Sequence, residues 1–353
     1  MFEQQYPFLH GKPELNGTIR SRNSDFYVEE YLGFQPSGQG EHLWLLVEKE
    51  NENTQYVANQ LAKLLGVQPK LASYSGKKDK YAVTRQWFSF PFPIKKSLPP
   101  AIEGPNFKAL IITRHDKKLK TGTHKANRFE INVQCEALDE ESELHLQHRV
   151  NAITQQGVPN YFGEQRFGHR FGNIEKALAM FANQIKVKDR NKRGMYLSAA
   201  RSFLFNHIIA QRINQDMFKP LCGDVFMLNG SHSVFCADNI DDDLITRHQA
   251  HDIQITGPMW GEGELKTQGI PLELEKQLLK DEVMSDLIKG LENARLKQER
   301  RSLNLFIPNL SFSRYDHGFT LKFELPTGCF ATSVLREIVN YTDASKNADF
   351  TQQ

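Results

Sequence analysis

The sequence has few cysteines and no long apolar segment. Its four cysteines, Cys135, Cys222, Cys236 and Cys329, are widely spaced and form no C-x-x-C pair. This spacing argues against a disulfide scaffold or a zinc site and favours reduced, packed thiols. No stretch approaches the roughly 18 apolar residues of a membrane span, and the first residues lack the apolar core of a signal peptide. We therefore expect a cytoplasmic protein without membrane association.

The sequence also lacks a phosphate-binding glycine loop and a cluster of metal ligands. Its GEGE segment, Gly261–Glu264, is not a dinucleotide-binding fingerprint. The pairs His145/His148 and His248/His251 have helical i,i+3 spacing but no third ligand nearby. We therefore predict a reaction that needs no metal ion and no organic cofactor.

Net charge is small, at +2, so only its distribution along the chain is informative. Residues Arg114–Arg128 contain six lysines or arginines against one acid, and Lys186–Arg193 contain five against one. A third group of lysines surrounds Asp79. Each cluster alone is equally consistent with solvated surface, but segregated basic clusters together are typical of a protein that binds a polyanion such as nucleic acid.

The first part of the chain mixes strand and helix patterns, and its 353 residues suggest two domains. Thr54 is expected to cap a helix that Gly66 ends. The mixture lacks regular strand-helix-strand repeats and favours an α+β fold. The expected strands cover His42–Glu48, Arg85–Phe92, Lys108–Thr113 and Arg128–Gln134, and a further helix precedes Gly157.

The middle of the chain has a different pattern. Gly157–Asn173 is rich in glycine and aromatic residues, which predicts a loop. Helical patterns follow over Leu197–Arg212 and Pro271–Leu296. Strand alternation returns over Phe319–Leu325, before a closing helix over Ala331–Asn340. An order of mixed, then helical, then strand segments is what an insertion into a core domain would produce.

Asp79 is the first candidate for chemistry. The Ser75-Gly76 pair indicates a turn, and a strand begins near Arg85, so Asp79 is expected on an exposed loop among lysines. Nearby cations favour the charged form of a carboxylate, which can act as a nucleophile or a base. On this pattern alone, a simple surface aspartate is the commoner interpretation.

Seven segments span nearly the whole chain: DFYVEE (Asp25–Glu30), GQGEH (Gly38–His42), GKKDKYAVTRQW (Gly76–Trp87), KANRFE (Lys125–Glu130), GVPNYFGEQRFG (Gly157–Gly168), RNKRGMYLSAARSFLFN (Arg190–Asn206) and LPTGCFATSVLREI (Leu325–Ile338). In this order they resemble motifs of the TruD family of tRNA pseudouridine synthases. The longer ones are specific. The alternatives are an RNA-binding or RNA-chaperone module without catalysis, against which the intact GKKDKYAVT argues, and an RNA methyltransferase, which needs a donor-binding loop that we do not find.

The resemblance implies a core with a mixed, mainly antiparallel sheet, formed by residues 1–156 and 304–353. It also implies a family-specific α/β domain inserted over residues 157–303. The expected substrate is transfer RNA, with the uridine at position 13 as the target. We expect no obligate protein partner and a monomer.

By the same resemblance, Asp79 is the catalytic aspartate. It would attack the sugar or the base, or remove a ribose proton, while the uracil is detached, turned and rejoined through its C5 atom. The target base must leave its stack to reach such a group. Phe26, Phe129 and Phe330 match family aromatics near the site, and Asn127 matches a polar residue that could read the uracil edge.

Simpler roles remain open for several of these residues. Phe129 shares a strand face with Ile131 and Val133, so core packing and base stacking are equal alternatives. Asn127 could cap a turn. Arg20 stands where the family often has a lysine and could pair with Asp79 or be an ordinary surface arginine. The expected RNA contacts are Lys77, Lys78, Lys117 and Lys118.

Overall fold

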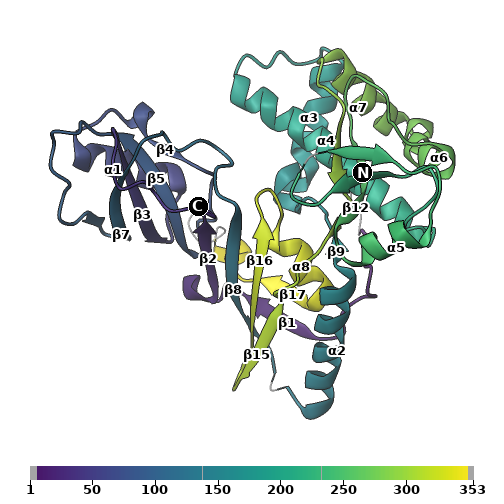
Figure 1. The fold of residues 1–353 in the computed structure, drawn as a ribbon, viewed down its shortest axis with the longest axis horizontal. Coiled ribbons are helices and arrows are strands. Elements are labelled where there is room, and N and C mark those ends of the chain that lie inside the picture. Colours follow the sequence, from purple (N-terminus) through teal and green to yellow (C-terminus); the bar gives the residue numbers. More distant parts are fainter. Residues whose placement is uncertain (1–5, 137, 232, 349–353) are drawn as a thin grey trace. The chain divides into compact units, whose positions relative to one another are not determined.

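The structure is a computed structural model, and it describes residues 6–136, 138–231 and 233–348. The chain divides into two compact units (Figure 1). The sheet unit comprises Glu14–Val150, Ile307–Ala331 and Ile338–Gln353. The central unit comprises Met1–Pro13, Asn151–Phe306 and Thr332–Glu337.

The sheet unit is built on a mixed sheet of 11 strands among the described residues. Neighbouring strands are antiparallel except for the parallel pairs β2/β5 and β1/β17, which confirms the predicted α+β fold with a mainly antiparallel sheet. The main path is β15 (Ser311–Tyr315), β16 (Gly318–Pro326), β8 (Ala126–Gln134), β2 (Phe26–Tyr31), β5 (Val83–Pro91), β3 (His42–Glu50), β7 (Phe107–His115) and β6 (Glu103–Gly104), and β1 (Asn16–Ile19), β17 (Asn340–Asp343) and β4 (Ser73–Tyr74) pair beside it.

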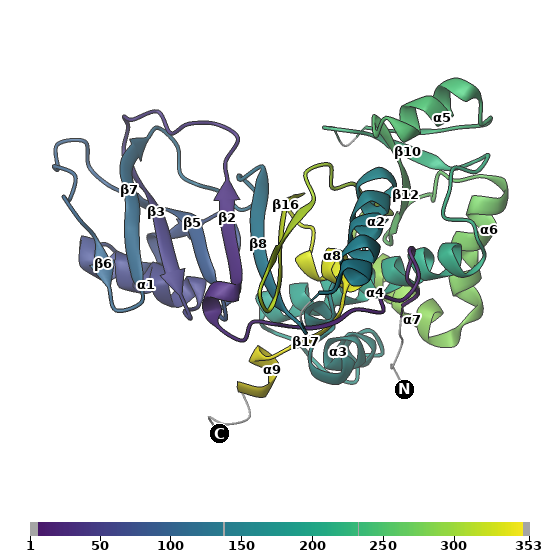
Figure 2. The ribbon, with the colours of Figure 1, turned by 90° about the horizontal axis from the view of Figure 1, so that it is seen from below.

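Helix α1 (Thr54–Leu65) covers one face of the β3–β5–β7 part of this sheet, as Figure 1 and Figure 2 show. Alternate residues of β3 point toward the helix, and the residues between them pack on the opposite face with Trp87 and Leu119. Burial on both faces fixes the register of these strands. The cluster under α1 includes Leu43, Leu45, Val47, Val57, Leu61, Phe88 and Phe90.

Helix α1 ends as predicted but begins differently. Gly66 has a left-handed φ of 69° and its N–H bonds to the carbonyl of Ala62. The predicted cap by Thr54 is wrong, because Asn53 occupies the cap position and Thr54 is already helical. The Thr54 hydroxyl is instead engaged by residues outside the helix, which a local sequence pattern cannot reveal.

The central unit combines helices with a small antiparallel sheet. Helix α4 packs against α3, α7 and β12, and Figure 1 shows the three helices together. The helices are α3 (Gly172–Phe181), α4 (Arg190–Asn214), α5 (Asp242–Gln249), α6 (Gly269–Gln277) and α7 (Glu282–Asn293), and the sheet order is β11 (Val234–Cys236), β10 (Val225–Leu228), β12 (Ile253–Met259) and β13 (Glu299–Ser302). Helix α2 (Glu140–Gln156) has residues in both units.

Two predictions near the end of the chain need correction. The helical stretch Pro271–Leu296 is broken, because Asp281 is extended and its carboxylate caps α7 by accepting the Met284 N–H. The closing helix α8 (Ala331–Ile338) stops before Asn340, because the next residues pair with β1 as β17. The remaining short elements are the 3-10 turns Asn23–Asp25, Pro69–Leu71, Glu164–Phe167, His169–Phe171 and Leu278–Lys280, and helix α9 (Ser345–Ala348).

We propose that residues 157–303 form a domain inserted into a core of residues 1–156 and 304–353. Strand β9 (Val158–Pro159) pairs with β14 (Asn304–Leu305), so the chain enters and leaves this segment at one place. Strand β16 then pairs with β8, so the chain returns to the sheet that its first part built. The compact central unit is wider than this insert, because it also includes a few residues on either side of 157–303 and the separate segments Met1–Pro13 and Thr332–Glu337.

Replacing residues 160–302 by a short flexible linker should leave a folded sheet unit, because its strands keep all their partners. Circular dichroism and a cooperative unfolding transition would measure this. A chain without cooperative unfolding would contradict the insertion model.

Candidate active site

The loop between β4 and β5 carries Asp79 and is held to the sheet by a chain of hydrogen bonds. The Lys78 N–H donates to the Thr54 hydroxyl at 2.9 Å, and that hydroxyl donates to Gln86 Oε1 at 2.8 Å. Gln86 Nε2 in turn donates to the carbonyl of Gly76 at 3.1 Å. The loop backbone is therefore fixed, while the Asp79 side chain is 41% exposed. A fixed but accessible carboxylate is the arrangement that chemistry on an external substrate requires.

Arg20 contacts the carboxylates of Asp79 and Asp343 and one aromatic ring. Its Nη2 lies 3.2 Å from Asp79 Oδ2, and its Nη1 lies 2.6 Å from Oδ2 of Asp343. The guanidinium carbon lies 3.8 Å from the centre of the Phe26 ring. Its side chain is only 5% exposed, so the surface role that the sequence left open does not apply. Asp343 was not among the predicted site residues.

The Arg20 backbone is unusual for a residue with a side chain. Its φ is +57°, a left-handed conformation that costs about 1 kcal/mol or more outside glycine. Ile19 lies beside Asp343 in the parallel β1/β17 pair. Strand β1 ends at Ile19, and the left-handed turn at Arg20 places the guanidinium next to the carboxylates of both Asp79 and Asp343.

Lys49 holds the backbone of the loop that carries Asp79. Its side chain is buried, and its ammonium donates to the carbonyls of Asp79 at 3.0 Å and Glu52 at 2.8 Å. Burial lowers the pKa of Lys49 to about 8, and the negative charge of Asp79 opposes part of that shift. Sequence patterns did not indicate this lysine, because a lysine near the end of a strand is usually exposed.

We predict that activity falls as the pH rises through about 8, because Lys49 then loses the charge that attracts Asp79. Stability should change in the opposite direction. The unfolded chain holds this proton up to the ordinary pKa of 10.5, so the free energy of unfolding rises with pH between about 8 and 10.5. Rates of the wild type and Lys49→Met between pH 6.5 and 9 would measure the effect. An identical high-pH limb in both would contradict it.

Lys78 does not face solvent. Its ammonium lies 2.7 Å from Oε1 of Glu30, and the two side chains are 7% and 0% exposed. The other Glu30 oxygen accepts the Trp87 N–H at 2.8 Å. Burial raises the pKa of Glu30, and the charge of Lys78 opposes that shift. This placement argues against the predicted phosphate contact by Lys78 and indicates a structural role under the loop.

His124 joins the same buried network. Its backbone N–H donates to the Ser75 hydroxyl at 3.0 Å, and its Nδ1 lies 2.5 Å from that oxygen. Burial and the charge of Lys78 lower the pKa of His124 to about 4. The ring is therefore neutral near pH 7, and it fixes the start of the loop without adding charge.

The predicted aromatic residues differ in exposure. Phe26 is 1% exposed beneath Arg20, whereas Phe129 is half-buried and stacks on Phe323 at 5.1 Å. The rings of Phe26 and Phe129 meet edge to face at 6.3 Å. Phe129 therefore has surface to offer a base, whereas Phe26 supports Arg20. Phe330 is half-buried, in the segment after β16.

Asn127 lies beside Glu30 and Leu325, its partners in the β8 pairing. It is 9% exposed. Its Oδ1 atom has no partner at hydrogen-bond distance and angle among the residues that the structure describes, although a side-chain interaction with Asn127 opposes part of the fall in the pKa of His124. A buried carbonyl oxygen without a partner is costly and often awaits a ligand. Lys77, Lys117 and Lys118 are exposed, as an RNA contact requires.

Within residues 6–136, 138–231 and 233–348, no three histidine, cysteine or carboxylate side chains gather where they could hold a metal ion. In the same ranges, no helix has the length and apolar character to span a membrane.

Comparison with known proteins identifies the family. A sequence model of tRNA pseudouridine synthase D (TruD) matches residues 4–179 and 172–338. A protein of that name from Colwellia psychrerythraea is 44% identical over 99% of this chain and 96% of its own length. Another, from Aeromonas hydrophila, is 43% identical over 97% of this chain and 96% of its own length.

A solved structure shows the same fold. A TruD chain from Methanosarcina mazei superposes with a TM-score of 0.70 over 96% of both chains, at 23% identity. The matches of sequence and fold thus fall within one class, the pseudouridine synthases. Within that class, this chain belongs to the TruD family.

Proposed function

We propose that this chain isomerises a uridine of transfer RNA to pseudouridine, with Asp79 as the reacting carboxylate. The proposal rests chiefly on one observation: Asp79 is accessible to solvent, yet buried Arg20 and Lys49 hold its carboxylate and its backbone in place. Family membership supports the substrate and the reaction. By the same membership, the target is the uridine at position 13.

The site supports three tasks in this reaction. Breaking the glycosidic bond leaves the sugar electron-poor, and a fixed carboxylate can attack it or the base, or remove a ribose proton. Arg20 stabilises the negative charge of the Asp79 carboxylate whenever no covalent bond joins that carboxylate to the substrate. Asn127 Oδ1 is free to accept a hydrogen bond from an N–H of uracil, and Phe129 offers a ring on which the flipped base can stack.

The test of this function is release of tritium from C5-labelled uridine in tRNA. Forming the new bond at C5 frees that hydrogen, so the wild-type chain should release about one equivalent per modified tRNA. A binding or chaperone module would hold the RNA and release none. We further propose that the chain works as a cytoplasmic monomer without cofactor or metal. Activity on pre-folded tRNA in the presence of a chelator tests the metal requirement.

We predict that tRNA binding is strongly salt-dependent. In the cluster Arg114–Arg128, Lys117 and Lys118 are exposed and their ammonium groups have no carboxylate partner among the described residues. Each phosphate contact contributes roughly −0.7 to −0.9 to the slope of log K against log salt. Lys117→Glu with Lys118→Glu should therefore make the slope shallower by about one to two units.

The matched control is Lys63→Glu with Lys95→Glu, which removes two exposed lysines outside that cluster. Affinities measured between about 50 and 200 mM salt give each slope. A wild-type slope near zero, or equal slopes for both double variants, would show that the cluster is only solvated.

A further inference from the structure

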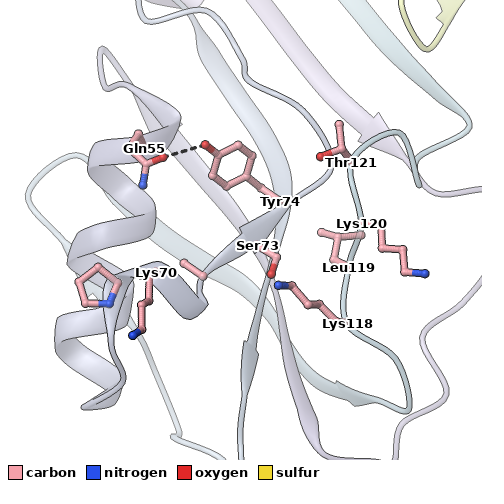
Figure 3. Close-up of a pocket in the computed structure, with 10 residues that line it drawn as sticks. Gln55, Lys70, Ser73, Tyr74, Lys118, Leu119, Lys120 and Thr121 are labelled. Carbon is pink, nitrogen blue, oxygen red and sulfur yellow. Dashed lines mark hydrogen bonds between the residues drawn. The ribbon is translucent and has the colours of Figure 1, made fainter. Parts of the chain in front are cut away.

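A hollow of about 480 Å³ lies beside the catalytic loop, in the sheet unit. Figure 3 shows its two walls. One is formed by β4 with the start of α1 and the turn at Lys70, and the other by the segment Lys118–Thr121. The hollow is open to solvent, and polar and apolar groups line it in similar measure, unlike the enclosed apolar cavities that hold small-molecule cofactors.

Three lysines line this hollow, and in the described part of the chain they form no ion pair. Lys70, Lys118 and Lys120 line it, and none of their ammonium groups has a carboxylate within 4.0 Å among the described residues. In Figure 3 the Lys118 side chain points toward Ser73, whereas the Lys120 ammonium turns outward. The unpaired ammonium of Lys118, which points toward Ser73, together with the nearby charge of Lys70 and Lys120, favours an anion in the hollow.

The lysine wall is held rigidly. Leu119 is 1% exposed, and its N–H donates to the Ser89 hydroxyl at 3.0 Å. Trp44 Nε1 donates to the carbonyl of Lys117 at 2.9 Å. The buried leucine anchors the segment, so the lysines on either side of it are presented to solvent from a fixed backbone.

The facing wall supplies a donor and a ring. The Ser73 hydroxyl is buried, and it has no hydrogen-bond partner within the part of the chain that the structure describes. Tyr74 donates from its hydroxyl to Gln55 Oε1 at 2.9 Å, and its ring contacts Phe88 edge to face. A free buried hydroxyl that faces lysines is a donor awaiting an acceptor such as a phosphate oxygen.

Both walls lead directly to the catalytic loop. Asp79 follows Tyr74 by five residues, so their Cα atoms lie at most about 18 Å apart. The second wall continues to Gly122, whose N–H donates to the carbonyl of Ser75 at 2.8 Å. An RNA whose target base occupies the site at Asp79 therefore has backbone within reach of the hollow.

We propose that this hollow is a docking subsite for the sugar-phosphate backbone of the substrate RNA, with Lys70, Lys118 and Ser73 gripping a phosphate. The proposal rests on the proposed function for the identity of the RNA. It assigns a binding role to Lys70 and Ser73, which lie outside the basic clusters of the sequence. The subsite would not discriminate between bases, because phosphate contacts position the RNA and carry no sequence information.

The experiment measures tRNA binding by Lys70→Gln, Ser73→Ala and a matched control, Lys63→Gln, an exposed lysine of α1 that does not line the hollow. Affinity should fall about fivefold for Lys70→Gln, the loss of one phosphate contact, and about three- to tenfold for Ser73→Ala. Lys63→Gln should keep wild-type affinity. Hydroxyl-radical footprinting should show one short stretch of tRNA backbone losing protection in both hollow variants.

A double-mutant cycle between Lys70→Gln and Lys118→Gln adds a second readout, because two groups that grip one phosphate have coupled effects. Wild-type affinity and an unchanged footprint in Lys70→Gln and Ser73→Ala would overturn the proposal, as would additive losses spread over the whole footprint. These measurements concern binding alone. A wild-type chain that binds tRNA but releases no tritium would therefore refute the proposed function and leave the subsite standing.

Discussion

Asp79→Asn should abolish turnover while leaving the affinity for tRNA within a few fold of the wild type. The amide keeps the size of the carboxylate and can still accept a hydrogen bond from Arg20, which lies 3.2 Å away. It cannot act as a nucleophile or a base, and such roles contribute roughly a hundredfold to ten-thousandfold in rate. Single-turnover tritium release, together with a binding assay, separates the two effects.

Asp116→Asn is the matched control, since it removes an exposed carboxylate of the same sheet unit and should keep wild-type turnover. Residual activity of Asp79→Asn above roughly a hundredth of the wild type would refute the catalytic assignment. A large loss of affinity in the same variant would instead mean that the negative charge organises the binding surface.

Lys78→Met should destabilise the fold by about 3–5 kcal/mol, because it leaves the carboxylate of Glu30 buried without its partner. The loss should depend on pH. Burial already raises the pKa of Glu30 above its ordinary 4.5, and without Lys78 the folded protein holds that proton still more strongly. Above about pH 4.5 the unfolded chain is ionised there, so the free energy of unfolding of this variant falls as the pH rises.

Urea titrations of the wild type, Lys78→Met and Lys77→Met at pH 5 and pH 8 would measure these differences. Lys77 is the exposed neighbour, so Lys77→Met should keep wild-type stability. The double change Glu30→Gln with Lys78→Met should recover part of the loss, because it removes the buried charge. Unchanged stability of Lys78→Met with weakened tRNA binding would restore Lys78 to the RNA contacts.

These two lysines show what the sequence could and could not predict. Lys77 and Lys78 are adjacent and chemically identical, and the pattern of charges assigned both to RNA. The two side chains face different surroundings, because Lys77 is exposed whereas Lys78 pairs with the buried Glu30. Glu30 itself lies in the DFYVEE motif, so its presence was noticed but its partner was not.

Motifs located the candidate site, whereas sequence patterns did not locate the residues that support it. The motif GKKDKYAVTRQW led to Asp79, and family position led to Arg20, which the structure brings into contact with it. Asp343 and Lys49 were missed because each reaches the site through tertiary contacts that leave no local signal. Their recognition needed the parallel β1/β17 pair and the burial of β3.

The fold shows a similar division. The long strands β3, β5, β8 and β16 were predicted because they alternate or run apolar over nine residues each. The short strands β10, β11 and β13 have only three or four residues, too few for a period to appear. The predicted helical middle of the chain therefore concealed a sheet.

The contact between Arg20 and Asp343 has a consequence for biosynthesis. Arg20 and Asp343 are 323 residues apart in the sequence, so Arg20 is translated long before its partner. Strand β1 likewise has no β17 to pair with until Asn340–Asp343 have been translated. Until then, a nascent chain can form the loop around Asp79, but its Arg20 lacks the contact with Asp343. A chain truncated before Asn340 would therefore lack both β17 and the contact with Asp343, and the Arg20 guanidinium would keep only one of its two carboxylate partners.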